Sequence, residues 1–147
     1  MTVANSVRQL VRSVALGDAG TAQRLNDELS AETREELGAF GTAVLSICLG
    51  HQFKDDSSHE AIRRFVDRMQ ANYANAQPPL KPFAIEGVIR AFAGEDHLLD
   101  EIPPRDQLAS QFPIIHEIVA ETPELRNHID DVLTDAETLV REWSEPE

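Results

Sequence analysis

Apolar side chains recur along the chain at a spacing of three to four residues, the period of an α-helix with one buried face. No segment shows the alternation of apolar and polar residues that is typical of a β-strand. The pattern therefore predicts an all-α protein, a single compact bundle of about six to seven helices that cross at irregular or orthogonal angles. We expect helices over residues 3–16, 18–29, 30–53, 57–73, 85–93, 108–119 and 122–143, with a short acidic helical stretch at 97–102.

Several helix ends are marked by residues that commonly cap helices. Gly17 can adopt a left-handed backbone and is expected to end the first helix, and Asp18 then caps the second. Ser30 is expected to cap the third helix. Ser57 and Glu60 have the spacing of a capping box, so we expect the fourth helix to begin at this pair.

The third helix is expected to form the centre of the core, because residues 40–49 are apolar on nearly all sides. Gly38 and Gly41 share one face of this helix, where each costs about 1 kcal/mol relative to alanine unless another backbone packs closely. We expect a close helix crossing there, and a helix break is the alternative. Cys48 lies in the same apolar stretch and is expected to be structural rather than nucleophilic.

Prolines shape the second half of the chain. Residues 77–82 contain three prolines and are expected to form an extended link. Pro113 lies within the sixth apolar stripe, which includes Leu108, so this helix should kink there or begin again. The last helix is expected to start at Thr122 and to carry its apolar face as far as Trp143.

The domain organisation and compartment follow from size and composition. Neither half of the chain is large enough to be comfortably stable alone, so we expect residues 1–143 to form one domain and residues 144–147 a frayed tail. One cysteine, no recognisable secretory signal and no apolar run near the roughly 20 residues of a membrane span predict a cytoplasmic protein. The 11 arginines against two lysines favour a bacterial source.

The charge is strongly acidic and unevenly distributed. The net charge is −13, of which residues 1–77 contribute −2 and residues 78–147 contribute −11. Such a surface repels the phosphate backbone of a nucleic acid, so nucleic-acid binding by the second half is disfavoured. The acidic half is expected either to be a solubilising surface or to face a basic partner.

One basic cluster stands out against this acidic background. Arg63, Arg64 and Arg68 lie within two turns of the fourth helix, and Glu60 is placed to pair with Arg64. One interpretation is a solvated face of ion pairs. The functional interpretation is a partner-binding site for an anionic group, from an acidic peptide or from the acidic half of a second copy of the chain.

No motif for metal, cofactor or nucleotide chemistry is recognisable. His59 and His116 each precede a glutamate, but neither pair continues to the second histidine of a zinc-protease motif. Glu124, His128 and Asp131 are spaced at helical turns, yet one helix rarely supplies a full metal shell. The chain also lacks glycine-rich phosphate-binding loops and a serine nucleophile motif. We therefore expect no cofactor, no metal and no catalytic residue.

The sequence by itself favours a protein–protein interaction or regulatory module without a catalytic centre, whose partner is another protein or a second copy of the chain. Its partner groove is expected beside the proline-rich link. The alternative is a ligand-binding or enzymatic bundle in which polar groups from His51, His97, His116 and His128 meet in a pocket between helices. A DNA-binding regulator that reads through the fourth helix is the third hypothesis.

Overall fold

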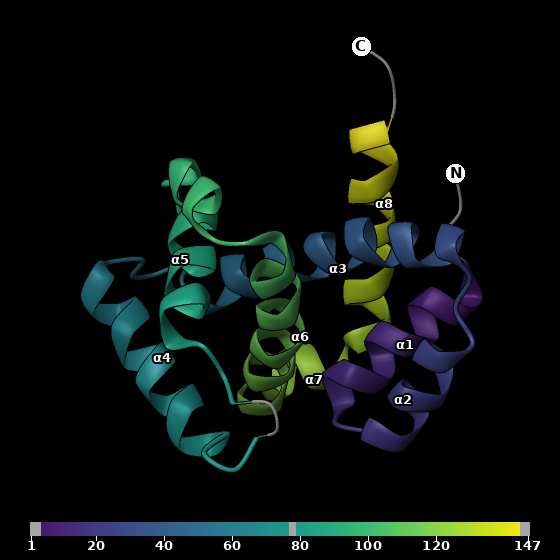
Figure 1. Ribbon diagram of the computed structural model, residues 1–147, viewed down its shortest axis with the longest axis horizontal. Helices are drawn as coiled ribbons and strands as arrows, with labels where there is room; N and C mark the ends of the chain where they lie inside the picture. Colours follow the sequence, from purple (N-terminus) through teal and green to yellow (C-terminus); the bar gives the residue numbers. More distant parts are fainter. Residues whose placement is uncertain (1–3, 77–78, 145–147) are drawn as a thin grey trace.

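The chain folds into helices joined by short turns. The computed structural model describes residues 4–76 and 79–144, and within these ranges every element of regular secondary structure is helical. This confirms the all-α prediction. Figure 1 shows the elements in order: α1 (Asn5–Leu16), α2 (Ala19–Asp27), α3 (Ala31–Gln52), α4 (His59–Asn72), α5 (Pro82–Phe92), the 3-10 helix η1 (Asp96–Glu101), α6 (Pro104–Glu121), α7 (Pro123–Asn127) and α8 (Ile129–Ser144).

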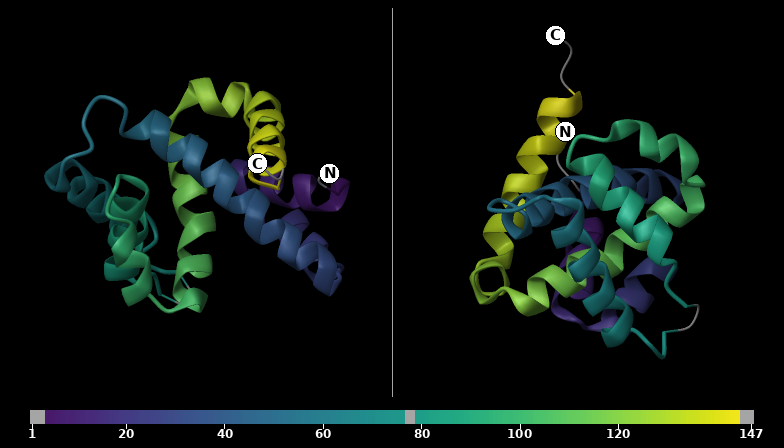
Figure 2. Two further views of the ribbon diagram at one scale, coloured as in Figure 1. Left: turned by 90° about the horizontal axis from the view of Figure 1, so that it is seen from above. Right: turned by 90° about the vertical axis from the view of Figure 1, so that its left-hand side faces the viewer.

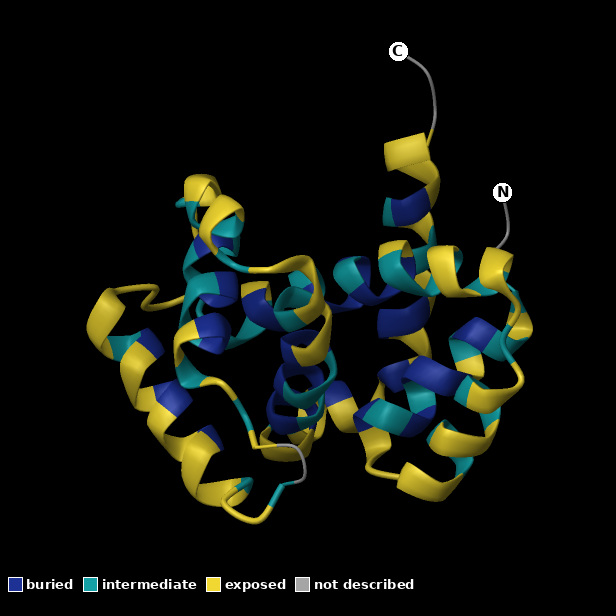
Figure 3. Ribbon diagram, viewed as in Figure 1, coloured by how far each residue is buried: buried dark blue, intermediate teal, exposed yellow. Residues whose placement is uncertain are grey.

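Helix α3 is the centre of the core, as its apolar composition predicts. Figures 1 and 2 show it passing through the middle of the molecule, with α4 and α5 near one end and α1, α2 and α8 near the other. It packs against α1, α5, α6 and α8, and its buried residues lie between Phe40 and Leu49. Figure 3 shows how the buried positions of the surrounding helices face inward. They join one connected apolar cluster with α3.

The predicted close crossing on α3 occurs at one of the two glycines. A Cβ at Gly41 would lie 3.2 Å from Gln111 Oε1 and 3.5 Å from the Phe112 ring of α6. A Cβ added at Gly38 would have no neighbouring atom within 4 Å, so close packing does not require this glycine. The alternative, a helix break, does not occur, because α3 continues without interruption past both residues.

The predicted caps at the first three helices are present. Gly17 has a left-handed backbone (φ 80°) and ends α1, and its N–H donates to the carbonyl of Val14. Asp18 accepts a hydrogen bond from the Thr21 N–H at the start of α2. Ser30 caps α3 and accepts from the Thr33 N–H.

The cap of the fourth helix lies one residue later than predicted. Its cap is Ser58, whose hydroxyl accepts from the Ala61 N–H, and not Ser57 with Glu60. The physical reason lies in the preceding turn. The Asp56 carboxylate accepts from the Ser58 N–H (3.0 Å), which fixes a turn over residues 56–58 and delays the first helical residue.

Prolines interrupt the helices less than predicted. Pro82 was expected in the extended link but begins α5, because a missing N–H costs nothing at the first helical position. Residues 79–81 of the link are not helical, and residues 77–78 lie outside the described ranges. Pro113 lies inside α6, which does not begin again there. Leu108 of the predicted core stripe is 58% exposed, whereas Ile114 and Ile118 are fully buried.

The last predicted helix is divided in two. Helix α7 ends at Asn127, His128 departs from helical geometry, and α8 begins at Ile129. This division and the separate η1 explain why the structure has nine helices within the described ranges rather than six to seven. Figure 1 shows the last turns of α8 extending away from the other helices, which leaves Trp143 53% exposed instead of buried. Of the predicted tail, Ser144 ends α8, and residues 145–147 lie outside the described ranges.

Polar contacts hold α1 beside α8. Arg8 Nη1 lies 3.0 Å from Glu137 Oε1, and its Nη2 donates to the main-chain oxygen of Asp130 and to the Thr134 hydroxyl. Arg12 Nε donates to the Asp130 carboxylate at 3.1 Å. The side chains of Arg8 and Glu137 are each only 20% exposed, so this pair is better shielded from solvent than an ordinary surface ion pair.

Among residues 4–76 and 79–144, no helix is both long enough and apolar enough to cross a membrane.

Candidate functional site

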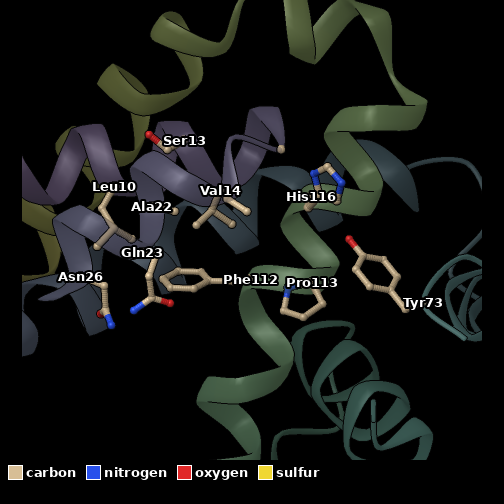
Figure 4. A pocket seen from close by; sticks show the side chains of 12 residues that line it. Leu10, Ser13, Val14, Ala22, Gln23, Asn26, Tyr73, Phe112, Pro113 and His116 are labelled. Carbon is tan, nitrogen blue, oxygen red and sulfur yellow. The ribbon is translucent and has the colours of Figure 1, made fainter. Parts of the chain in front are cut away.

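A cavity of about 510 Å³ lies between α1, α2 and α6. Figure 4 shows the side chains that line it, which include Tyr73, the residue directly after α4. Most of the lining is apolar, and none of the 12 lining residues is a lysine, arginine, aspartate or glutamate. The lining consists of Leu10, Ser13, Val14, Gly17, Ala19, Ala22, Gln23, Asn26, Tyr73, Phe112, Pro113 and His116.

The turn at Gly17 shapes one wall of this cavity. Its left-handed backbone reverses the chain so that α1 and α2 pack against each other and both face α6. A Cβ at this position would lie 2.9 Å from His116 Cε1, a distance that real Cβ contacts do not reach. A glycine here therefore serves two needs, the turn itself and the space that the His116 ring occupies.

His116 and Tyr73 form the polar end of the cavity. His116 Nδ1 lies 3.4 Å from the carbonyl oxygen of Ala15. Because a carbonyl oxygen can only accept, Nδ1 carries the proton in this contact, and in the neutral ring Nε2 is left with its lone pair. The Tyr73 ring meets the His116 ring edge-on, with 6.1 Å between centroids.

The Tyr73 hydroxyl is buried and has no hydrogen-bond partner among the described residues. Figure 4 shows it pointing toward the His116 ring. An unsatisfied buried hydroxyl is uncommon in proteins and costs free energy. Burial, with a smaller contribution from the charge of Glu117, raises the pKa of Tyr73 to about 12, so this hydroxyl keeps its proton at ordinary pH.

Glu117 lies behind this polar end. The residue is only 4% exposed, and its Oε1 accepts a hydrogen bond from Asn72 Nδ2 at 2.5 Å. Burial raises the pKa of Glu117 above its ordinary value. The hydrogen bond from Asn72 lowers this pKa in part, and the nearby charge of Glu121 raises it further. The charged form of Glu117 therefore lowers the stability of the folded protein.

We expect the variant Glu117→Gln to raise Tm at neutral and alkaline pH. Because the native pKa of Glu117 is raised, the charged carboxylate lowers stability above that pKa, and the loss vanishes as the pH falls below the unfolded value of about 4.3. Glutamine can still accept from Asn72. Thermal unfolding of both proteins across this pH range measures the difference, which should shrink on acidification.

Glu142→Gln is the matched control, because Glu142 is exposed on α8 and its charge stays hydrated in the folded protein. A gain for Glu117→Gln that equals the control at every pH would contradict the buried-charge interpretation.

Each of the three arginines of the predicted partner site has a carboxylate partner within the described chain. Arg63 Nε lies 3.4 Å from Glu86, and Arg64 Nη1 lies 3.0 Å from Glu60. Arg68 contacts both oxygens of Glu121 at 3.2 Å and stacks over the Phe65 ring. The three side chains are exposed along α4, and the binding of an anionic partner to them stays a prediction.

The four histidines of the alternative hypothesis do not meet. Only His116 lines the cavity. His51 lies 3.7 Å from Glu124, His128 lies 3.7 Å from Asp131, and His97 is exposed on η1. The spacing of Glu124, His128 and Asp131 thus produces no common site. Within residues 4–76 and 79–144, no group of three or more His, Cys, Asp or Glu side chains is arranged to hold a metal ion.

Sequence reasoning missed Tyr73 as a site residue, because its apolar ring comes at the end of the predicted fourth helix (residues 57–73) and no motif includes it. The signal that could have marked it is its position, directly after the last residue of α4 and beside the proline-rich link. Cys48 behaves as expected of a core residue: it is fully buried, and burial raises the pKa of its thiol to about 12.

Among the other hollows of the described chain, two bear on the predictions from the sequence. One, of about 550 Å³, lies beside the proline-rich link between α5 and α6, at the place where the sequence predicts a partner groove, and it shares Tyr73 and Pro113 with the first cavity. The other, of about 480 Å³, lies over Ala39 of α3 between the exposed side chains of Leu108 and Trp143.

The chain has no significant match among models of protein families, curated protein sequences or solved structures.

Proposed function

We propose that the cavity between α1, α2 and α6 binds a small, mainly apolar molecule. Its volume of about 510 Å³ lies in the range of known ligand pockets, roughly 300–1,000 Å³. Such pockets combine apolar walls with a few polar groups that fix the orientation of the ligand. Here Leu10, Val14 and Phe112 supply apolar wall, and Tyr73 and His116 supply the polar end.

The observation that carries the proposal is the Tyr73 hydroxyl. Its oxygen is buried without a partner in the described chain and points toward His116 across the end of the cavity. Because this oxygen is buried, the Tyr73 side chain would have to shift toward the cavity before a ligand could supply the missing hydrogen bond. Ser13, by contrast, already donates its hydroxyl to the carbonyl of Gln9.

The interaction module that the sequence favours rests on a different surface. Arg63, Arg64 and Arg68 are each engaged with a carboxylate of the described chain, so an anionic partner would have to displace these pairs. Protein or DNA binding through α4 therefore stays a prediction, and the cavity supports ligand binding more directly.

We expect a screen of small apolar fragments to raise Tm, because a molecule that binds only the native state stabilises it. At a concentration of 100 times Kd the gain is about 2.7 kcal/mol, a rise in Tm of roughly 5–10 °C for a chain of this size. The binding site is checked by NMR, through shifts of the Leu10 and Val14 methyl signals.

The variant Ala22→Phe fills the cavity and should abolish this gain. Ala71→Phe on the exposed face of α4 is the matched control and should retain it. Equal stabilisation of Ala22→Phe and the parent protein would place binding outside the cavity, and a screen without any shift would contradict the proposal.

A further inference from the structure

We infer that the polar end of the cavity recognises a neutral hydroxyl group on the ligand, through Tyr73 Oη as donor and His116 Nε2 as acceptor. This inference rests on the proposed function and names the class of ligand, an apolar alcohol or phenol. The two groups come from different parts of the chain, one directly after α4 and the other on α6, and they face the same cavity.

The hydrogen-bonding roles of the two groups follow from their other contacts. When the neutral His116 ring donates its Nδ1–H to the carbonyl of Ala15, its Nε2 presents a lone pair and acts as an acceptor. Nε2 has no hydrogen-bond partner among the described residues, and it is not among the polar atoms that are buried without one, so it remains accessible. Tyr73 keeps its proton, and its buried hydroxyl has no acceptor among the described residues, so it can donate once the side chain shifts toward a ligand in the cavity.

A hydroxyl is the simplest group that matches this pair. Its oxygen accepts from Tyr73 while its hydrogen is donated to His116 Nε2. An ether or ketone oxygen could accept from Tyr73 but would leave His116 without a donor. An alkylammonium group could donate to Nε2, but it would lose its hydration among apolar walls whose lining contains no carboxylate.

A carboxylate does not match the site, although many apolar ligands carry one. The lining holds no lysine or arginine that could pair with it. The charge of Glu117 also reaches this end of the cavity, since it adds to the rise in the pKa of Tyr73. A second negative charge would therefore be both unpaired and repelled.

Four probes with one ring system test the inference: naphthalene, 2-naphthol, 2-methoxynaphthalene and 2-naphthoate, each titrated at about pH 7 with binding followed by NMR. We expect 2-naphthol to bind about threefold to tenfold more tightly than 2-methoxynaphthalene, the usual contribution of one hydrogen bond. We expect 2-naphthoate to bind more weakly than 2-naphthol.

The variant His116→Phe keeps an aromatic ring and removes the acceptor, so it should reduce the preference for 2-naphthol over 2-methoxynaphthalene. The variant Tyr73→Phe removes a donor that can serve both probes, so it should weaken the binding of both relative to naphthalene. Ser13→Ala is the matched control, because Ser13 lines the cavity but its hydroxyl is engaged with Gln9, and it should leave the preference unchanged. Thermal unfolding of each variant verifies that it folds.

The outcomes separate the inference from the proposed function. If naphthalene binds but 2-naphthoate binds as tightly as 2-naphthol, or if the preference for 2-naphthol survives His116→Phe, the hydroxyl inference is overturned and ligand binding stays intact. The same holds if Tyr73→Phe leaves the binding of 2-naphthol and 2-methoxynaphthalene relative to naphthalene unchanged. The absence of binding by all four probes would overturn both.

Discussion

Phe40→Ala is expected to lower the free energy of unfolding by about 3–5 kcal/mol, the usual cost of removing a buried phenylalanine. Phe40 is fully buried on α3, the helix around which α1, α5, α6 and α8 pack. Its ring belongs to the apolar cluster shared by these helices, so the hole cannot be closed by a movement of one neighbour. Because domains of this size are stable by roughly 5–15 kcal/mol, the variant should lose a large part of its stability.

Urea unfolding measures this loss, and Phe83→Ala is the matched control. Phe83 is 88% exposed near the start of α5, so its truncation should change the free energy of unfolding by no more than about 0.5 kcal/mol. A loss for Phe40→Ala that is no larger than the loss for Phe83→Ala would contradict the placement of α3 at the centre of the core.

Gly17→Ala is expected to cost about 1–2 kcal/mol from its left-handed backbone alone. The added Cβ would also come within 2.9 Å of His116 Cε1, so the histidine ring must move or the turn must open. We therefore expect a further loss of stability, and weaker ligand binding in the cavity. Urea unfolding and the NMR signals of the His116 ring measure the two effects.

Substitutions at two other glycines distinguish the effect of backbone strain from the effect of the contact with His116. Gly94→Ala introduces backbone strain (φ 124°) but no contact within 4 Å, so it should destabilise without affecting the cavity. Gly20→Ala places a methyl group in open space within α2 and should raise stability by about 0.5–1 kcal/mol. Unchanged His116 signals in Gly17→Ala would contradict the second role of this glycine.

Features that depend on neighbours in the sequence could be predicted from the sequence. The turn at Gly17, the caps at Asp18 and Ser30 and the central position of α3 follow from backbone preference, short-range hydrogen bonds and apolar composition. Each of these is decided within a few residues or by a strong local pattern, so no knowledge of the tertiary structure is needed.

Features that depend on distant segments could not be predicted in this way. Leu108 and Trp143 continue apolar stripes that predict burial, but both side chains are exposed in the folded chain. Tyr73 and His116 are more than 40 residues apart in the sequence, and they face each other only when the end of α4 meets α6 in the folded chain. The histidine was one of four candidates, and periodicity offered no means of choosing it.

The pairing of α1 with α8 has a consequence for folding during synthesis. Arg8 binds residues more than 120 positions later in the chain, so its partners are made long after α1 itself. Helices α1 and α2 are neighbours in sequence and can form a hairpin early, whereas the face of α1 that meets α8 must wait uncovered on the ribosome. The emergence of α8 is therefore the event that supplies the partners of Arg8 and covers this side of α1.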